Sequence, residues 1–154
     1  MWYDLSELHH VGLVVDDLEE SAAALRELYG VDVVLFAEAR YPCLIDGVPY
    51  DTVQRMGLSA GPPFVELIRT VPGSPVWQSR PGIHHLGFVV DDLVAASGQL
   101  SANGAPLWMS GGHAGVSPGG AVYHRDPLGQ VIELLDRATA ERLAIRRANA
   151  APER

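Results

Sequence analysis

The stretch LHHVGLVVDDL at residues 8–18 decides the fold, because it recurs as IHHLGFVVDDL at residues 83–93. Eight of the eleven positions are identical, and the other three exchange one apolar residue for another. A second pair of related stretches follows, FVELI at 64–68 and VIELL at 131–135. The first pair is offset by 75 residues (85 − 10) and the second by 67 (133 − 66), so the first copy is eight residues longer between its two signatures. The chain is therefore an internal duplication.

Each copy has the same order of predicted elements. A run rich in β-branched residues predicts a strand, and the Asp-Asp-Leu that follows it predicts the start of a helix. Gly30 and Asn103-Gly104 are plausible helix ends. Short strands are expected at 31–37, 50–58 and 63–70 in the first copy and at 105–109, 119–125 and 130–136 in the second. The sequence thus predicts an α+β fold of two tandem βαβββ modules, 1–79 and 80–136, that form a cleft-shaped mixed sheet, followed by a helical tail at 137–154.

The bulk composition limits the classes of function. The chain has 154 residues and a formal net charge of −8, which disfavours nucleic acid and anionic membranes as partners. Cys43 is the only cysteine, so neither an intrachain disulfide nor a thiolate-rich zinc site can form. The start MWYDLSELHHVG lacks the pattern of a signal peptide, and no apolar run approaches the roughly 20 residues of a membrane span. We expect a cytoplasmic homodimer that binds a small molecule.

Strand periodicity selects one histidine from each His-His pair. Alternate side chains of a strand share a face, so His10 shares its face with Gly12, whereas His9 lies on the apolar face. The apolar face is expected to pack under the helix, which leaves His10 to point into an open concavity. The same phase selects His85 over His84, so His9 and His84 are expected to serve packing alone.

Glutamates occupy equivalent positions in the two copies. Glu66 and Glu133 each lie inside an apolar strand, where a carboxylate is costly unless it is paired or binds a metal. One strand histidine is more often a structural residue than a ligand, but equivalent His and Glu positions in both copies need a joint explanation. We predict that His10, Glu66, His85 and Glu133 hold one divalent ion per site. Two imidazoles and two carboxylates suit Co, Ni, Zn, Mn or Fe(II).

These signatures resemble the vicinal oxygen chelate superfamily, which includes glyoxalase I, methylmalonyl-CoA epimerase, extradiol dioxygenases and the fosfomycin- and bleomycin-resistance proteins. The resemblance covers residues 7–136 and is carried by HHVGLVVDDL, FVELI, GIHHLGFVVDDL and DPLGQVIELLD. It implies metal ligands from the first and last strands of each module, which are the four residues named above. It does not fix the reaction, because members share a scaffold and differ in chemistry.

Two branches of this superfamily resemble different parts of the chain. The His/Glu/His/Glu set is similar to bacterial glyoxalase I, whereas VPGSPVWQSRPGIHHLGF at 71–88 resembles the epimerase branch. That branch more often has glutamine at the Glu66 position, and its His-Arg-Glu-Glu stretch after the first helix is replaced here by FAEAR at 36–40. The resemblance to the epimerase branch implies a second acid–base residue that faces the metal; Gln54 lies near the expected position and is a candidate substrate-binding residue. Unaligned acidic substitutes are Glu38, Asp46 and Asp51.

Other candidate substrate contacts lie in the second module. The glycine-rich stretch 110–120 reads as a lid or as a plain hairpin connection, and His113 within it is a candidate substrate contact. Tyr123 and His124 face opposite ways along one strand, so at most one of them points into the pocket. The tail arginines are expected to form a solvated helix face; these are Arg142, Arg146 and Arg147.

The leading hypothesis is removal of a proton next to a carbonyl or thioester, with an epimerase, isomerase or glyoxalase-type lyase outcome. Glu133 or Glu66 would be the base, and a metal-stabilised enolate would be the intermediate. The first alternative is an extradiol-type dioxygenase, in which His10, His85 and Glu133 alone hold Fe(II). The second is a small-molecule binding or resistance protein without catalysis, although such relatives typically lack the metal ligands.

Overall fold

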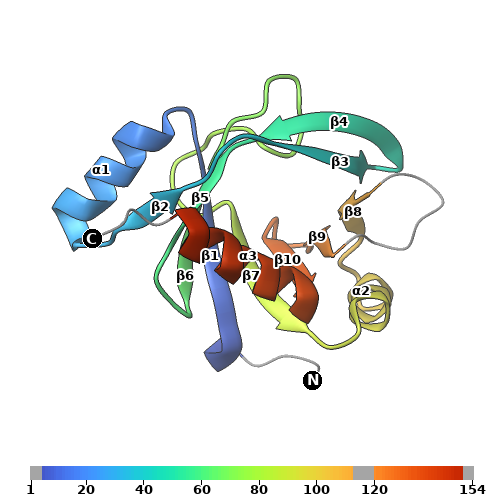
Figure 1. Cartoon of the computed structure of the whole chain (residues 1–154). Coiled ribbons are helices and arrows are strands. Elements are labelled where there is room, and N and C mark those ends of the chain that lie inside the picture. Colours follow the sequence, from blue (N-terminus) through green and yellow to red (C-terminus); the bar gives the residue numbers. More distant parts are fainter. Residues whose placement is uncertain (1–4, 113–119, 151–154) are drawn as a thin grey trace.

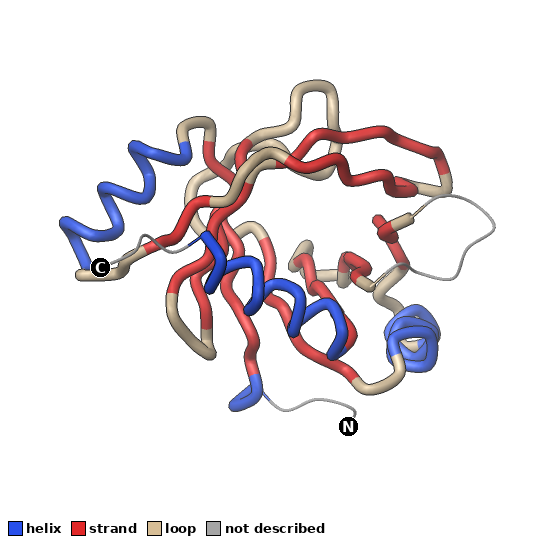
Figure 2. Tube along the Cα trace, viewed as in Figure 1, coloured by secondary structure: helices blue, strands red, loops and turns tan. Residues whose placement is uncertain are grey.

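The computed structural model describes residues 5–112 and 120–150. One curled mixed sheet of ten strands forms the centre of this part of the chain, with helices around it (Figures 1 and 2). The strands are β1 (Leu8–Val15), β2 (Val33–Leu35), β3 (Ala39–Ile45), β4 (Val48–Gln54), β5 (Met56–Ser59), β6 (Phe64–Arg69), β7 (His85–Val90), β8 (Leu107–Gly111), β9 (Ala121–Arg125) and β10 (Val131–Asp136). The helices are the 3-10 turn η1 (Leu5–Glu7), α1 (Leu18–Tyr29), α2 (Leu93–Ala102) and α3 (Arg137–Ala150). The predicted α+β class is confirmed.

The first helix of each copy begins where the Asp-Asp-Leu signature predicts. Asp17 accepts a hydrogen bond from the backbone N–H of Glu20 at 2.9 Å, and Asp92 accepts one from Ala95 at 3.0 Å. Each aspartate therefore caps the backbone donors that the first turn leaves unpaired. Gly30 ends α1 in the left-handed conformation, with φ 67°, as predicted.

The duplication brings equivalent strands together at the middle of the sheet. The strand order is β2-β5-β6-β1-β7-β10-β9-β8-β3-β4. The two signature strands, β1 and β7, pair antiparallel with each other. On its other side β1 pairs parallel with β6, and β7 pairs parallel with β10. The first and last strands of both copies are thus four neighbours, as a metal site shared by the copies requires.

The first copy contains a hairpin that the sequence analysis missed. The strand predicted at 50–58 is two strands, β4 and β5, and β3 was not predicted at all. The hairpin β3–β4 turns at Asp46 and Gly47, with φ 49° and 76°, and β3 pairs antiparallel with β8 of the second copy. This hairpin lies between the signatures of the first copy, where the repeat offsets place its eight additional residues.

Two hydrophobic clusters lie on opposite sides of the central strands. Phe88 and Leu134 pack with Leu93 and Ala96 of α2 on the outer side. On the inner side a larger cluster includes residues from both copies and is joined by Leu143 of α3, so that α3 crosses the hollow of the curled sheet (Figure 1). Among the described residues, no helix combines the length and the apolar character that crossing a bilayer requires.

Candidate metal centre and pocket

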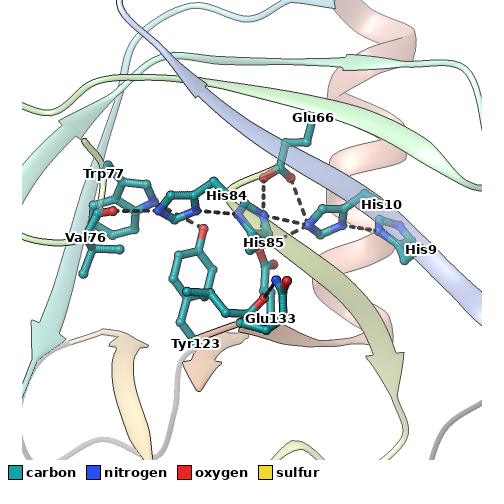
Figure 3. Close-up of polar contacts among 11 residues, drawn as sticks. His9, His10, Glu66, Val76, Trp77, His84, His85, Tyr123 and Glu133 are labelled. Carbon is teal, nitrogen blue, oxygen red and sulfur yellow. Dashed lines mark hydrogen bonds and ion pairs between the residues drawn. The ribbon is translucent and has the colours of Figure 1, made fainter. Parts of the chain in front are cut away.

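The four predicted ligands converge from the four central strands. His10 comes from β1, Glu66 from β6, His85 from β7 and Glu133 from β10 (Figure 3). One ligand atom of each residue lies within 4.8 Å of the ligand atoms of the other three. Both histidines are fully buried, and Glu66 and Glu133 are 3% and 6% exposed. The structure therefore brings together residues that are up to 123 positions apart in the sequence.

Two glycines make room for the histidine rings. Gly12 is the cross-strand partner of His85, and Gly87 is the partner of His10. A Cβ atom at Gly12 would lie 2.0 Å from Cε1 of His85, and one at Gly87 would lie 2.1 Å from Cε1 of His10. No side chain fits at such distances, so the HxG pattern of both signatures is needed to place the two imidazoles over the neighbouring strand.

The spacing of the donor atoms fits one divalent ion. His10 Nε2 and His85 Nε2 are 3.1 Å apart, and Glu133 Oε1 lies 3.2 and 3.1 Å from them. Glu66 places Oε1 3.2 Å from His85 Nε2 and Oε2 3.7 Å from His10 Nε2. Two ligand atoms about 2.1 Å from one ion and at right angles to each other are about 3 Å apart. The donor set and its spacing are thus consistent with a divalent metal site in this buried His₂Glu₂ cluster.

The electrostatics of the cluster also favour a cation. Burial alone would lower the pKa of His85, but hydrogen bonds and charge from Glu133 and Glu66 outweigh burial and raise that pKa to about 9. The pKa of His10 is raised in the same way, mainly by the charges of Glu66 and Glu133. Burial would raise the pKa of Glu133, but the neighbouring histidines hold it below its ordinary value. Two close carboxylates in a dry site require compensating positive charge, which protons or a metal ion can supply.

Each ligand histidine is in contact with the histidine before it. His84 Nδ1 lies 2.9 Å from His85 Nδ1, and His84 Nε2 donates a hydrogen bond to the Val76 carbonyl at 2.7 Å. Because that donation uses the only N–H of a neutral imidazole, His84 Nδ1 accepts from His85 Nδ1–H. His9 Nδ1 lies 2.8 Å from His10 Nδ1. The expectation that His9 and His84 serve packing alone is therefore wrong, since both hold a ligand ring.

A cavity of about 290 Å³ opens beside the cluster, and both glutamates line it. Two of the three predicted substrate contacts lie in this cavity, and the third, His113, lies outside the described residues. Gln54 lines it from β4, and Tyr123 lines it from β9 with its hydroxyl accepting a hydrogen bond from Trp77 Nε1 at 3.2 Å. Their role in binding stays a prediction.

The remaining candidates lie elsewhere. His124 is held between the Ala105 carbonyl and the Ser97 hydroxyl, each at 2.8 Å, so Tyr123 is the member of the pair that faces the cavity. None of the acidic substitutes lines the cavity, and each is paired with an arginine: Glu38 with Arg69, Asp51 with Arg40, and Asp46 with Arg125.

The sequence pattern did not reveal the contribution of α3. Arg142 and Arg146 were expected on a solvated face; Arg142 is exposed as expected and Arg146 is half-buried, and both line the cavity together with Thr139 and Leu143. These four residues recur at the helical spacing i, i+3, i+4 and i+7, which is the only signal that could have identified the cavity-facing side. Since their mixture of polar and apolar side chains forms no hydrophobic stripe, this signal was not visible.

Known proteins with similar sequences and folds include several epimerases. An ethylmalonyl-CoA/methylmalonyl-CoA epimerase of Cereibacter sphaeroides is 30% identical over 117 residues, covering 70% of this chain and 78% of that protein. The crystal structure of methylmalonyl-CoA epimerase from Mycobacterium tuberculosis is similar with a TM-score of 0.57 and 25% identity, over 85% of this chain and 87% of that one. A Streptomyces coelicolor methylmalonyl-CoA epimerase variant in complex with 2-nitronate-propionyl-CoA has the same TM-score at 17% identity, over 86% and 97% of the two chains.

The family is shown by a match over most of the chain. Residues 9–123 match the Glyoxalase/Bleomycin resistance protein/Dioxygenase superfamily. This range contains both His-His pairs and three of the four clustered donors, while Glu133 follows on β10. The duplicated modules, the curled sheet and the paired His and Glu positions agree with that match, and the chain therefore belongs to the Glyoxalase/Bleomycin resistance protein/Dioxygenase superfamily.

Proposed function

We propose that this chain is a divalent-metal enzyme that removes a proton from the carbon next to the carbonyl of an acyl thioester, with epimerisation of that carbon as the outcome. The observation that carries the proposal is the buried His₂Glu₂ cluster, whose two carboxylates line a cavity of about 290 Å³. The similarity to an ethylmalonyl-CoA/methylmalonyl-CoA epimerase supports an acyl thioester as the substrate class.

His10, Glu66, His85 and Glu133 are the residues that would hold the ion. When bound, a divalent ion supplies a Lewis acid that stabilises the negative charge of an enolate. Both imidazoles are fully buried, so the protein holds these two donors in a water-poor environment.

The two glutamates approach the cavity from opposite sides of the histidines. Glu66 lies on β6 and Glu133 on β10, and the histidine strands β1 and β7 run between them. A substrate carbon above the histidines would then have one carboxylate on each side. If one carboxylate accepts the α-proton and the other, entering the cycle as the carboxylic acid, gives its proton to the opposite face, the carbon is inverted, and exchange with solvent then returns both groups to their starting forms.

Glu133 is the better candidate for the proton acceptor. It contacts both histidines through Oε1 alone. Its second oxygen, Oε2, takes no part in these contacts and is available for a substrate proton. Glu66, by contrast, uses both of its oxygens on the histidines.

A fourth donor argues against the dioxygenase alternative. Fe(II) oxygenases use two histidines and one carboxylate and leave open positions for O₂ and substrate. Here Glu66 completes a set of four donors, with oxygens 3.2 and 3.7 Å from the two imidazoles. Four donors favour a Lewis acid without redox chemistry.

Deuterium uptake from D₂O tests the proposal. Protein loaded with Co, Ni, Mn or Zn should incorporate solvent deuterium at the α-carbon of methylmalonyl-CoA, and Glu133→Gln should lose exchange far more than it loses binding. Glu38→Gln is the matched control, because Glu38 is exposed and pairs with Arg69 outside the cavity. Fe(II)-dependent oxygen consumption without deuterium uptake would refute the proposal and favour the dioxygenase.

A further inference from the structure

The helix α3 presents two arginines to the cavity beside the metal centre. Arg142 and Arg146 line it from α3, while Glu66 and Glu133 line it from the sheet. Leu143, which lies between the arginines on the same helix face, packs against the inner hydrophobic cluster. The helix α3 crosses the hollow of the sheet (Figure 1), and its two arginines line the same cavity as the two glutamates of the sheet.

Neither arginine has an acidic partner in the described part of the chain. Arg142 donates to the Thr139 hydroxyl at 2.9 Å, and Arg146 donates to the Ala37 carbonyl at 3.1 Å. Arg40, the third arginine in the cavity wall, is paired with Asp51 at 3.3 Å. The chain has a net charge of −8, yet neither α3 guanidinium forms an ion pair with a carboxylate among residues 5–112 and 120–150.

The position of Arg146 limits how freely it can move. Its guanidinium lies 4.6 Å from the centre of the Phe36 ring, and burial lowers its pKa from the ordinary value. A guanidinium held over an aromatic ring keeps its planar fork oriented, so that the remaining N–H groups can bind an anion without a large loss of side-chain freedom.

Gln54 adds a second, independent sign of a missing acceptor. Its side-chain Nε2 is buried and has no hydrogen-bond partner among the residues that the structure describes. The same side chain lines the cavity. A buried donor without a partner is costly, so an acceptor oxygen of a bound ligand would remove that cost.

We propose that Arg142 and Arg146 bind a free carboxylate on the acyl group of the substrate, so that the chain selects acyl thioesters of dicarboxylic acids. This inference rests on the proposed function for the thioester. The cavity, at about 290 Å³, is at the lower limit of sites that enclose drug-sized ligands, about 300–1,000 Å³. It therefore suits a short acyl group and not the phosphates of a whole coenzyme, and the matching anion is a carboxylate, which a guanidinium fork binds with two hydrogen bonds.

The experiment compares two thioesters that differ only in the carboxylate. Binding of methylmalonyl-CoA and propionyl-CoA is measured by calorimetry on wild type and on the double variant Arg142→Gln/Arg146→Gln, both metal-loaded and metal-free. The double variant should bind methylmalonyl-CoA about 10- to 100-fold more weakly, with little change for propionyl-CoA. Lysine at both positions keeps the charge without the fork, and should retain part of the discrimination. Arg137→Gln is the matched control, because Arg137 lies on the same helix and pairs with Asp91 outside the cavity.

The measurements on metal-free protein distinguish the contribution of the arginines to binding from that of the ion, because a bound ion can itself attract a carboxylate. An equal loss for both thioesters would mean that the arginines act on the coenzyme phosphates or on the helix, and it would overturn the inference, as would an unchanged affinity. Binding requires no turnover, so the two proposals can fail separately. Lost deuterium exchange with intact discrimination refutes the function alone, and intact exchange without discrimination by wild type refutes the inference alone.

Discussion

Replacement of His84 by phenylalanine should weaken metal binding although His84 is not a ligand. The ring of His84 joins the Val76 carbonyl to the buried ligand His85 through contacts of 2.7 and 2.9 Å (Figure 3). This chain of hydrogen bonds keeps the proton of a neutral His85 on Nδ1, which leaves Nε2 unprotonated toward the glutamates. Phenylalanine has a similar shape but neither accepts nor donates, so it removes both hydrogen bonds and keeps most of the packing.

The size of the expected loss of metal affinity in His84→Phe follows from the burial of His85. Its ring is fully buried, so water cannot replace the lost acceptor, and a buried donor without a partner costs about 1–3 kcal/mol. The imidazole can avoid this cost by moving its proton to Nε2, but that proton would occupy the position of the metal. Loss of such a supporting hydrogen bond typically lowers metal affinity about 10- to 100-fold, which is about 1.4–2.7 kcal/mol. This range agrees with the cost of a buried donor without a partner.

Competition with a chromophoric chelator at fixed pH measures the affinity, and ¹⁵N NMR of His85 reports which ring nitrogen carries the proton. His84→Asn should recover part of the affinity, because its side-chain oxygen can take the place of Nδ1. His124→Phe is the matched control: His124 is equally buried and makes two hydrogen bonds at 2.8 Å, but it lies outside the metal cluster. This control should lower the free energy of unfolding and leave metal affinity unchanged.

Equal losses of metal affinity in His84→Phe and His124→Phe would refute the reasoning, because general destabilisation would then explain both. An unchanged affinity in His84→Phe with His85 still protonated on Nδ1 would also refute it. In that case another group must fix the ring.

Two further predictions concern the space around the rings and their protonation. Gly87→Ala should abolish stoichiometric metal binding, because its Cβ would lie 2.1 Å from Cε1 of His10. Gly98→Ala is the control and should leave the metal content unchanged, because a Cβ there meets no atom within 4 Å. Metal analysis after dialysis tests this, and a fully loaded Gly87→Ala protein would contradict it. The metal-free chain should be less stable to urea at pH 9 than at pH 6.5, because the pKa of His85 is raised from 6.5 to about 9, so its stabilising contribution is complete below the unfolded value and is lost as the pH rises through the folded value. Metal-free His85→Gln should lack that part of the pH dependence, and an identical slope in both proteins would contradict the assignment.

The clustering of the four candidate ligands could be predicted from the sequence because strand geometry is strict. Side chains alternate with a period of two, so a strand histidine that shares a face with glycine has only one possible side. The duplication supplied the second half of the argument, since equivalent His and Glu positions had to lie near each other if the signature strands paired. The structure places them on neighbouring strands, with Gly12 opposite His85 and Gly87 opposite His10.

The same rule could not reveal the contacts between adjacent histidines. Periodicity gives the face of a residue but not the rotation of its ring, and His84 precedes the first residue of β7. The hairpin β3–β4 was missed for a related reason. Pro42 lies within β3 and lacks the N–H that strand pairing uses, so its stretch did not predict a strand. Its pairing with β8 is a long-range contact that no local pattern records.

The role of α3 depends on tertiary position alone. A helix that packs on a core shows an apolar stripe, but a helix that forms one wall of a polar cavity needs arginine and threonine among its inward residues. Thr139, Arg142 and Arg146 therefore read as a solvated face in the sequence, and they become cavity-lining residues only because the curled sheet places its hollow beneath α3. The sheet thus provides the donors that a metal ion requires, while the helix provides the positive charge that discriminates between ligands.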